Sequence, residues 1–411
     1  MSEIILKKAN RILFLNTLAF TICFFVWMIN SVLITFLVGK FEWSQWSSIE
    51  IGYLMAIPVL SGSIFRLPVG ILTDKFGGKP VMIGLLAICA VPTYLLSYAG
   101  GFWSFAICGI GFGLVGTSFA VGIGYTSIWF PKEKQGFALG LFGMGNIGAA
   151  LTAILAPKLL TYLTKGGVNI DAWTILPKIY SGALVFMAII FFIFTENKKP
   201  ESSSKTLSRM MQPLRNTRVW RFGLYYFLVF GGFVALVNWL QPIYKNVFNL
   251  DKETAGFYVA TFVIASSIVR AIGGYLSDEI GARKVMYFVL LFSLIISGGL
   301  MLWTPTNVTV YVSIIIVLGC IWGTGMAAVY KHIPDYFPQE VGVVGGMVGV
   351  LGGLGGFVSP IVFGYLKDGT GLWSSCWIVI ALLSAVSLVW MHRIVKQKIL
   401  KQTELRLSNI G

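Results

Sequence analysis

Twelve long apolar segments constrain this chain more than any other feature of its sequence. A helix needs about 20 apolar residues to cross the ~30 Å hydrocarbon core of a bilayer. The segments lie at 12–39, 49–73, 80–99, 102–130, 136–160, 177–195, 220–244, 254–277, 284–303, 308–332, 341–366 and 373–394. Because 56% of the residues are hydrophobic and only 11% are charged, the chain does not belong to the soluble globular class. We therefore expect an all-α membrane protein with twelve transmembrane helices.

One polar connection divides the twelve segments into two groups of six. It covers 196–219, where basic residues flank a run of serines, whereas the other connections are short. We therefore expect an N-terminal half at 1–195, a cytoplasmic linker at 196–219 and a C-terminal half at 220–395. The remaining residues, 396–411, form a basic tail that we expect in the cytoplasm.

The 31 lysines and arginines are distributed unevenly over this pattern. If both termini lie in the cytoplasm, 22 of them fall in cytoplasmic segments and seven on the other side. Positive residues concentrate on the cytoplasmic side of membrane proteins. We therefore expect a multi-pass protein of the cytoplasmic (inner) membrane with both termini inside. The net charge of +15 then reflects topology and contact with anionic lipids, and we expect no nucleic-acid partner.

The remaining two basic residues lie inside apolar segments, at matching positions of an internal repeat. The segment GSIFRLPVGILTDKFGGKPV at 62–81 aligns with SSIVRAIGGYLSDEIGARKV at 266–285. The alignment pairs Arg66 with Arg270, Gly70 with Gly274, Asp74 with Asp278, Gly77 with Gly281 and Lys79 with Arg283. An arginine in hydrocarbon costs several kcal/mol, so it faces the interior of the helix bundle and marks function. Two arginines at equal depth in two halves predict one anion held between the halves.

The chemistry of these arginines indicates the shape of that anion. Arg66 precedes Asp74 by eight residues, about 12 Å along a helix, which places it near the membrane midplane. All 16 Asp and Glu residues lie in tails, loops or helix ends, so no carboxylate is expected at that depth. The planar, forked guanidinium group suits a flat anion with three oxygens better than a lysine would.

Two motifs carry a resemblance to known families. The segment Gly70–Lys79 (GILTDKFGGK) and its copy Gly274–Arg283 resemble the signature of the major facilitator superfamily. The segment WFPKEKQG at 129–136, continued by ALG at 138–140 and GNIG at 145–148, resembles the nitrate signature of the nitrate/nitrite porter (NarK-type) family. This resemblance covers the whole chain. It implies the major facilitator fold and transport of nitrate and nitrite.

The resemblance also implies roles for individual residues. In the anion site, two arginines would clamp the ion, a tyrosine would donate to it, an asparagine would line the site and two phenylalanines would sandwich the ion. These residues are Arg66, Arg270, Tyr226, Asn146, Phe119 and Phe230. The residues expected to gate the site or permit its conformational change are Gly70, Asp74, Lys79, Asp278, Arg283, Gly145, Gly148, Gly352 and Gly355. This chain departs from the pattern at Gly353, which offers no amide opposite Asn146.

The sequence leaves the coupling of transport open. Proton symporters commonly use carboxylates or histidines within the membrane, but here His332 and His392 lie near the ends of their segments. This observation favours exchange of nitrate for nitrite. The opening LAFTICFFVWMINSV at 18–32 and Leu67-Pro68 beside Arg66, in contrast, resemble the branch associated with nitrate–proton symport. Both alternatives are retained.

Three other functions are less compatible with the sequence. A porter for a carboxylate or phosphate ester would normally need more polar groups than two arginines and a few hydroxyls. A non-transporting anion sensor would be favoured by an appended soluble domain, and the longest loop is the linker. No nucleophile–base pair, metal cluster or cofactor motif points to an enzyme, and the five cysteines form no CxxC pair. We expect a monomer without a cofactor or bound metal.

Overall fold

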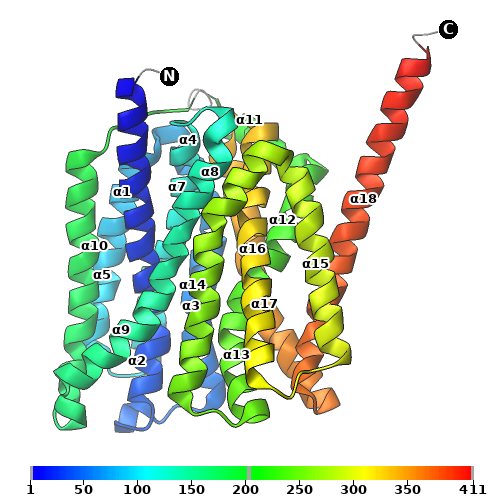
Figure 1. The fold of residues 1–411 in the computed structure, drawn as a ribbon. Coiled ribbons are helices and arrows are strands. Elements are labelled where there is room, and N and C mark those ends of the chain that lie inside the picture. The colour runs from blue at the N-terminus through cyan, green and yellow to red at the C-terminus, as the bar shows by residue number, and fades with distance from the viewer. Residues whose placement is uncertain (1–2, 201–204, 409–411) are drawn as a thin grey trace.

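A computed structural model describes residues 3–200 and 205–408 of the chain. Its helices run side by side, and both chain ends lie at the same end of the bundle (Figure 1). The helices of the first half are α1 Glu3–Trp27, α2 Ile29–Leu37, α3 Ser48–Ile64, α4 Arg66–Phe76, α5 Gly78–Leu95, α6 Phe102–Gly113, α7 Ser118–Ser127, α8 Lys132–Gly143, α9 Ile147–Leu163 and α10 Ile175–Phe194. The later helices are α11 Leu207–Met211, α12 Thr217–Tyr226, α13 Gly232–Phe248, α14 Lys252–Leu276, α15 Ala282–Leu302, α16 Val308–Tyr336, α17 Val341–Thr370 and α18 Cys376–Ser408.

The prediction of twelve transmembrane helices is confirmed. Eleven helical stretches of the described chain are long and apolar enough to cross a membrane, and one of them, Glu253–Leu302, contains 50 residues. That stretch joins α14 to α15 through a π-helical turn at Ser277–Gly281. Gly281 has a φ of +89°, a left-handed conformation that glycine adopts without strain. The chain reverses there, so α14 and α15 are two separate crossings (Figure 1).

The predicted linker and tail contain more helix than their polar sequences suggest. Within the linker, α11 is followed by a 3₁₀ turn at Gln212–Arg215, and α12 begins at Thr217. Residues 201–204 of the linker lie outside the described residues. The tail continues α18 as helix to Ser408, and α18 projects from the bundle (Figure 1). Residues 409–411 lie outside the described residues.

Five crossings are interrupted near their middle. The interruptions are Met28 between α1 and α2, Phe65 between α3 and α4, the 3₁₀ segments Leu114–Thr117 and Met144–Asn146, and the π-helical segment Phe227–Gly231. Irregular backbone at membrane depth is tolerated only where protein surrounds it. Short π-helical insertions are also frequent at functional sites. The interruptions adjoin most of the residues expected in the anion site, so they shape its walls.

Glycines bring helices of opposite halves into backbone contact. A Cβ atom placed on Gly70 of α4 would overlap the carbonyl oxygen of Gly342 on α17. A Cβ atom on Gly274 of α14 would overlap the carbonyl oxygen of Gly136 on α8. Small residues permit such close approach of membrane helices. The two contacts are related by the internal repeat, and both lie toward the end of the bundle that carries the termini.

The other glycines named from the sequence pack helices within each half. Side chains on Gly145 and Gly148 would overlap α1 at Phe20 and Thr21. On α17, a side chain at Gly352 would overlap the ring of Tyr226. A Cβ atom at Gly355 would lie 2.6 Å from the carbonyl oxygen of Phe227. Their expected part in conformational change stays a prediction.

Candidate anion-binding site

The structure brings the two repeat-related arginines together. Arg66 is the first residue of α4, directly after the interruption at Phe65, and Arg270 lies on α14. Their exposed fractions are 0% and 1%. Their guanidinium carbons lie 5.8 Å and 5.1 Å from the centroid of one ring, that of Phe119. The two charges therefore come from opposite halves and meet at a single aromatic side chain.

The donors of these guanidinium groups are only partly used. Arg66 donates from Nε to the Gly116 carbonyl oxygen at 3.2 Å and from Nη1 to the Gly349 carbonyl oxygen at 2.7 Å. Its Nη2 has no hydrogen-bond partner among the described residues, and the same holds for Nε and Nη1 of Arg270. In the described chain, neither arginine has a carboxylate within ion-pair distance. Buried, unpaired charges are costly, and a bound anion would relieve the cost.

Parallel aromatic rings flank this pair of charges. The rings of Phe119 and Phe230 are inclined by 5°, and their centroids are 6.4 Å apart. Phe230 also lies 5.1 Å from the Arg66 guanidinium carbon. A planar ion between two rings requires about 7 Å, because each face contributes a contact of roughly 3.5 Å. The centroid separation is smaller than this, so the two rings would have to move apart to admit a flat ion.

Tyr226 and Asn146 differ in how closely the structure ties them to the site. The Tyr226 ring is parallel to Phe119 at 6.0 Å, and its buried hydroxyl has no partner among the described residues. Asn146 is buried at the end of a 3₁₀ segment, with its Oδ1 also unpartnered. Within the described chain, Asn146 makes no hydrogen bond to either arginine. The same crossing contacts Arg270 at Gly143, where a Cβ atom would overlap the Arg270 guanidinium group.

Tyr330 is a site residue that the sequence reasoning missed. It is buried on α16, where its hydroxyl donates to the Gly345 carbonyl oxygen at 3.1 Å. Its ring stands edge-on to Phe119 at 4.7 Å and to Tyr226 at 4.8 Å. No motif surrounds it in the sequence, and one tyrosine within an apolar run is ordinarily a packing residue.

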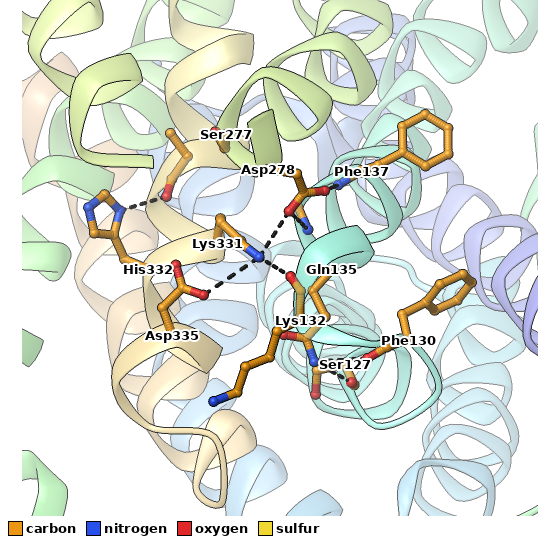
Figure 2. A network of polar contacts seen from close by, with 12 residues as sticks. Ser127, Phe130, Lys132, Gln135, Phe137, Ser277, Asp278, Lys331, His332 and Asp335 are labelled. Carbon is orange, nitrogen blue, oxygen red and sulfur yellow. Dashed lines mark hydrogen bonds and ion pairs between the residues drawn. The ribbon is translucent and has the colours of Figure 1, made fainter. Parts of the chain in front are cut away.

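Two aspartates join the halves at the end of the bundle that carries the termini. Asp74, on α4, accepts hydrogen bonds from the Gly342 and Val343 amides at 2.9 Å and 2.8 Å. These amides lie in the first turn of α17, where the helix dipole favours a negative charge. Asp278 accepts from the amides of Gly136 and Phe137, on α8, at 2.9 Å and 2.7 Å (Figure 2). Each contact links a carboxylate of one half to backbone of the other.

Only the second of these contacts contains a lysine. The Nζ atom of Lys331 lies 2.9 Å from Asp278 and 3.5 Å from Asp335, and it donates to the Lys132 carbonyl oxygen (Figure 2). Lys331 therefore contacts both halves. Aligning Phe130-Pro131 of the first half with Phe337-Pro338 of the second places Gly124 at the position that corresponds to Lys331. Among the described residues, Asp74 has no ion-pair partner.

The basic residues that the sequence assigned to the gate contact other groups. Lys79 donates to the Thr195 carbonyl oxygen at 2.6 Å, at the end of α10. Arg283 donates to the Tyr336 hydroxyl at 3.1 Å. Both residues thus contact neighbouring helices of their own half, and the basic residue beside Asp278 is Lys331.

Comparisons with known proteins identify the family. Residues 15–360 match the model of the Major Facilitator Superfamily. Over 97% of its length, the chain is 40% identical to a protein from Thermus thermophilus named probable nitrate/nitrite antiporter NarK1, of which 94% is covered. The chain belongs to the nitrate/nitrite porter family of the Major Facilitator Superfamily.

Further relatives of this porter agree with that assignment. It is 31% identical over 96% of its length to the probable nitrate transporter NarT of Staphylococcus haemolyticus, covering 99% of that protein. It is 29% identical over 92% of its length to a nitrite extrusion protein of Bacillus subtilis, covering 93% of it. Among solved structures, the fucose transporter FucP in the outward conformation has a TM-score of 0.71 at 16% identity, with 92% of this chain and 97% of that chain covered. That likeness establishes the fold alone.

The unpartnered hydroxyl of Tyr226 leads to a specific prediction for this porter. Tyr226→Phe removes the hydroxyl but keeps the ring, and a hydrogen bond to an ion contributes about 1.5–3 kcal/mol. We expect nitrate affinity, measured by calorimetry on purified protein, to fall about tenfold or more. Tyr244→Phe is the matched control, because it removes another buried, unpartnered hydroxyl from the next helix, α13. Equal affinities of both variants would contradict a role for Tyr226 in binding.

The backbone contact at Gly70 leads to another prediction. In Gly70→Ala, the new methyl group would overlap the Gly342 carbonyl oxygen and force α4 away from α17. Overpacking of this kind costs about 1–3 kcal/mol. The arrangement in which α4 and α17 are in contact should therefore become roughly 5- to 150-fold less populated. Distances between spin labels on α4 and α17 would report the change. Gly84→Ala is the control, because a Cβ atom there meets nothing within 4 Å. An unchanged distance distribution in Gly70→Ala would contradict the expectation.

Proposed function

We propose that this chain is a secondary transporter that carries nitrate, with nitrite as co-substrate or product, across the cytoplasmic membrane by alternating access. The observation that carries the proposal is the pair of buried arginines, Arg66 and Arg270, whose charges meet at the Phe119 ring. Neither charge has a carboxylate partner among the described residues. The names of the curated relatives support the same substrate.

The site suits nitrate for three reasons. The unpartnered donors of Arg66 and Arg270 match the oxygens of a singly charged oxyanion. The parallel rings of Phe119 and Phe230 favour a flat ion, and the spacing of 6.4 Å disfavours a tetrahedral one. The Tyr226 hydroxyl supplies one more donor from the C-terminal half. A sugar phosphate or a dicarboxylate would require more room and more donors.

Anion binding would also control the conformational change. Arg66 and Arg270 belong to opposite halves, so their mutual repulsion opposes closure of an empty site. An anion between them offsets the repulsion and binds most tightly when both guanidinium groups reach it. A ligand shifts a conformational equilibrium by its difference in affinity for the two states. The loaded porter would therefore close around the ion and reopen on the other side.

The aspartate contacts would hold one end of the pathway shut. The excess of positive residues assigns the end with both termini to the cytoplasm. In this arrangement, Asp74 and Asp278 seal the cytoplasmic end, each through two backbone amides of the opposite half. Opening toward the cytoplasm would break four such hydrogen bonds together with the Lys331–Asp278 ion pair.

Nitrate uptake by liposomes containing the purified protein tests this function and its coupling. The vesicles are loaded with nitrite or with inert buffer, and each set is assayed with and without an inward proton gradient. Uptake that requires internal nitrite and ignores the gradient identifies an exchanger. Uptake into nitrite-free vesicles that follows the proton gradient identifies a symporter. An absence of nitrate movement under every condition would contradict the proposed function.

A further inference from the structure

A second basic pocket lies apart from the pathway between the halves, at the end of the bundle that carries the termini. Its walls come from α12, α15, α16 and α18, all of them in the C-terminal half. Three arginines line it: Arg218 and Arg221 on α12, and Arg283 on α15. Its cavity volume is about 50 Å³. One water molecule needs roughly 10–15 Å³ by this measure, so the pocket has room for a small polar group.

No carboxylate of the described residues neutralises the positive charges of this pocket. None of its three arginines lies within ion-pair distance of a carboxylate in the described chain. Arg283 donates to the Tyr336 hydroxyl at 3.1 Å, and Arg218 lies 5.0 Å from the centroid of the same ring. Both guanidinium groups thus contact the side chain of Tyr336. Like charges repel, and an anion among them would offset the repulsion.

Buried donors in the same pocket also lack acceptors. The side chain of Tyr225 lines the pocket and is 1% exposed, and its hydroxyl has no hydrogen-bond partner among the described residues. The Nε atom of Arg221 is likewise buried without a partner. Nearly all buried polar groups in proteins are paired, so two orphaned donors beside three cations indicate a missing acceptor. His332 lines the pocket and donates from Nδ1 to the Ala328 carbonyl oxygen at 2.7 Å, and its Nε2 accepts from neither of these two donors.

The remaining wall of the pocket is apolar. It is formed by Met391, Ile394 and Val395 of α18. A free inorganic ion gains nothing from such a wall, whereas the glycerol and acyl portions of a phospholipid do. Basic pockets between transmembrane helices on the cytoplasmic side are known to bind lipid headgroups.

We propose that this pocket binds a phosphate group, supplied by an anionic lipid of the adjacent leaflet. Arginine forks match the several oxygens of a phosphate, and the Tyr225 hydroxyl adds a further donor. Arg218 and Arg283, both exposed, receive the phosphate at the surface, and the partly buried Arg221 holds it from within. Because Tyr225 directly precedes Tyr226 on α12, the lipid braces the helix that carries a tyrosine of the anion site.

Lipid binding to the intact purified protein tests this site without reference to transport. Native mass spectrometry and thermal unfolding are followed during titration with phosphatidylglycerol, phosphatidylcholine or inorganic phosphate. We expect phosphatidylglycerol to bind and to raise the unfolding temperature, and phosphatidylcholine to do neither. The double variant Arg221→Gln/Arg283→Gln should bind phosphatidylglycerol at least about tenfold more weakly, because it loses two charged donors.

A matched control variant distinguishes lipid binding in this pocket from attraction of the lipid by surface charge in general. Lys284→Gln/Arg393→Gln also removes two positive charges at the same end, from exposed residues that do not line the pocket. It should bind phosphatidylglycerol as the native protein does. If the first double variant aggregates, Arg283→Gln alone replaces it, because that side chain is exposed. Binding of inorganic phosphate that is lost in the pocket variant would support the phosphate site with a soluble source. Equal lipid binding by both double variants would overturn the proposal.

Discussion

Replacing Arg66 or Arg270 with lysine is expected to abolish nitrate transport while leaving the protein folded. Lysine keeps the positive charge but replaces the rigid planar fork of donors with a compact ammonium group, which does not match two oxygens of a flat anion in a fixed geometry. Each lost hydrogen bond to an ion costs about 1.5–3 kcal/mol, so uptake should fall by roughly a hundredfold or more. Uptake into liposomes measures the loss, and size-exclusion chromatography with thermal unfolding reports folding.

A conservative exchange outside the site provides the control for these variants. Arg209→Lys makes the same chemical change at an exposed residue of the linker, and it should transport nitrate at the native rate. Near-native uptake by both Arg66→Lys and Arg270→Lys would refute the forked clamp. It would indicate that positive charge alone draws the anion into the site.

Replacing Asp278 with asparagine is expected to open the end of the bundle that carries the termini more than the same change at Asp74. Lys331 and Asp278 form an ion pair with side chains only 7% and 5% exposed. Removing one partner of a buried pair costs up to about 3–5 kcal/mol, and here Lys331 would keep only the more distant, partly exposed Asp335, at 3.5 Å, as an ionic partner. Asp74→Asn loses only charge-assisted hydrogen bonds, at about 1–3 kcal/mol. Distances between spin labels on α8 and α14, and on α4 and α17, would measure the closed population.

A double variant identifies the cause of that difference. In Asp278→Asn/Lys331→Met the incompletely paired lysine charge is also removed, so the closed population should recover part of the loss seen in Asp278→Asn alone. A double variant as open as the single one would show that Lys331 contributes little. Equal opening by Asp74→Asn and Asp278→Asn would show that the two contacts are energetically alike, although only Asp278 has a lysine partner among the described residues.

The number of crossings could be predicted from the sequence because membrane thickness fixes the length of an apolar helix. The helix ends could not, because a helix continues into water where polar residues allow it. The final segment was predicted to end at 394, yet α18 runs to Ser408. The interruptions at Phe65 and Met144–Asn146 were also not predicted, since hydrogen-bond patterns within a crossing depend on neighbouring helices.

The residues of the candidate site also divide into those that could be predicted from the sequence and those that could not. The depth and pairing of Arg66 and Arg270 follow from the repeat and from helix rise, because a buried charge stands out in an apolar segment. Phe119 and Phe230 are apolar residues within apolar segments, so they do not stand out in the sequence. Only the family resemblance indicated a role for them. Lys331 was counted as one more positive residue on the cytoplasmic side, which concealed its contact with Asp278. Tyr330 gave no signal, because its position beside Phe119 arises only when the two halves pack.

An experimental structure of the porter with nitrate bound tests the central claim most directly. We expect density for one planar ion between the Phe119 and Phe230 rings, with oxygens within hydrogen-bond distance of Arg66 and Arg270. The centroid separation of those two rings should increase from 6.4 Å to about 7 Å. Nitrate bound elsewhere, with both arginines still unpartnered, would contradict the account.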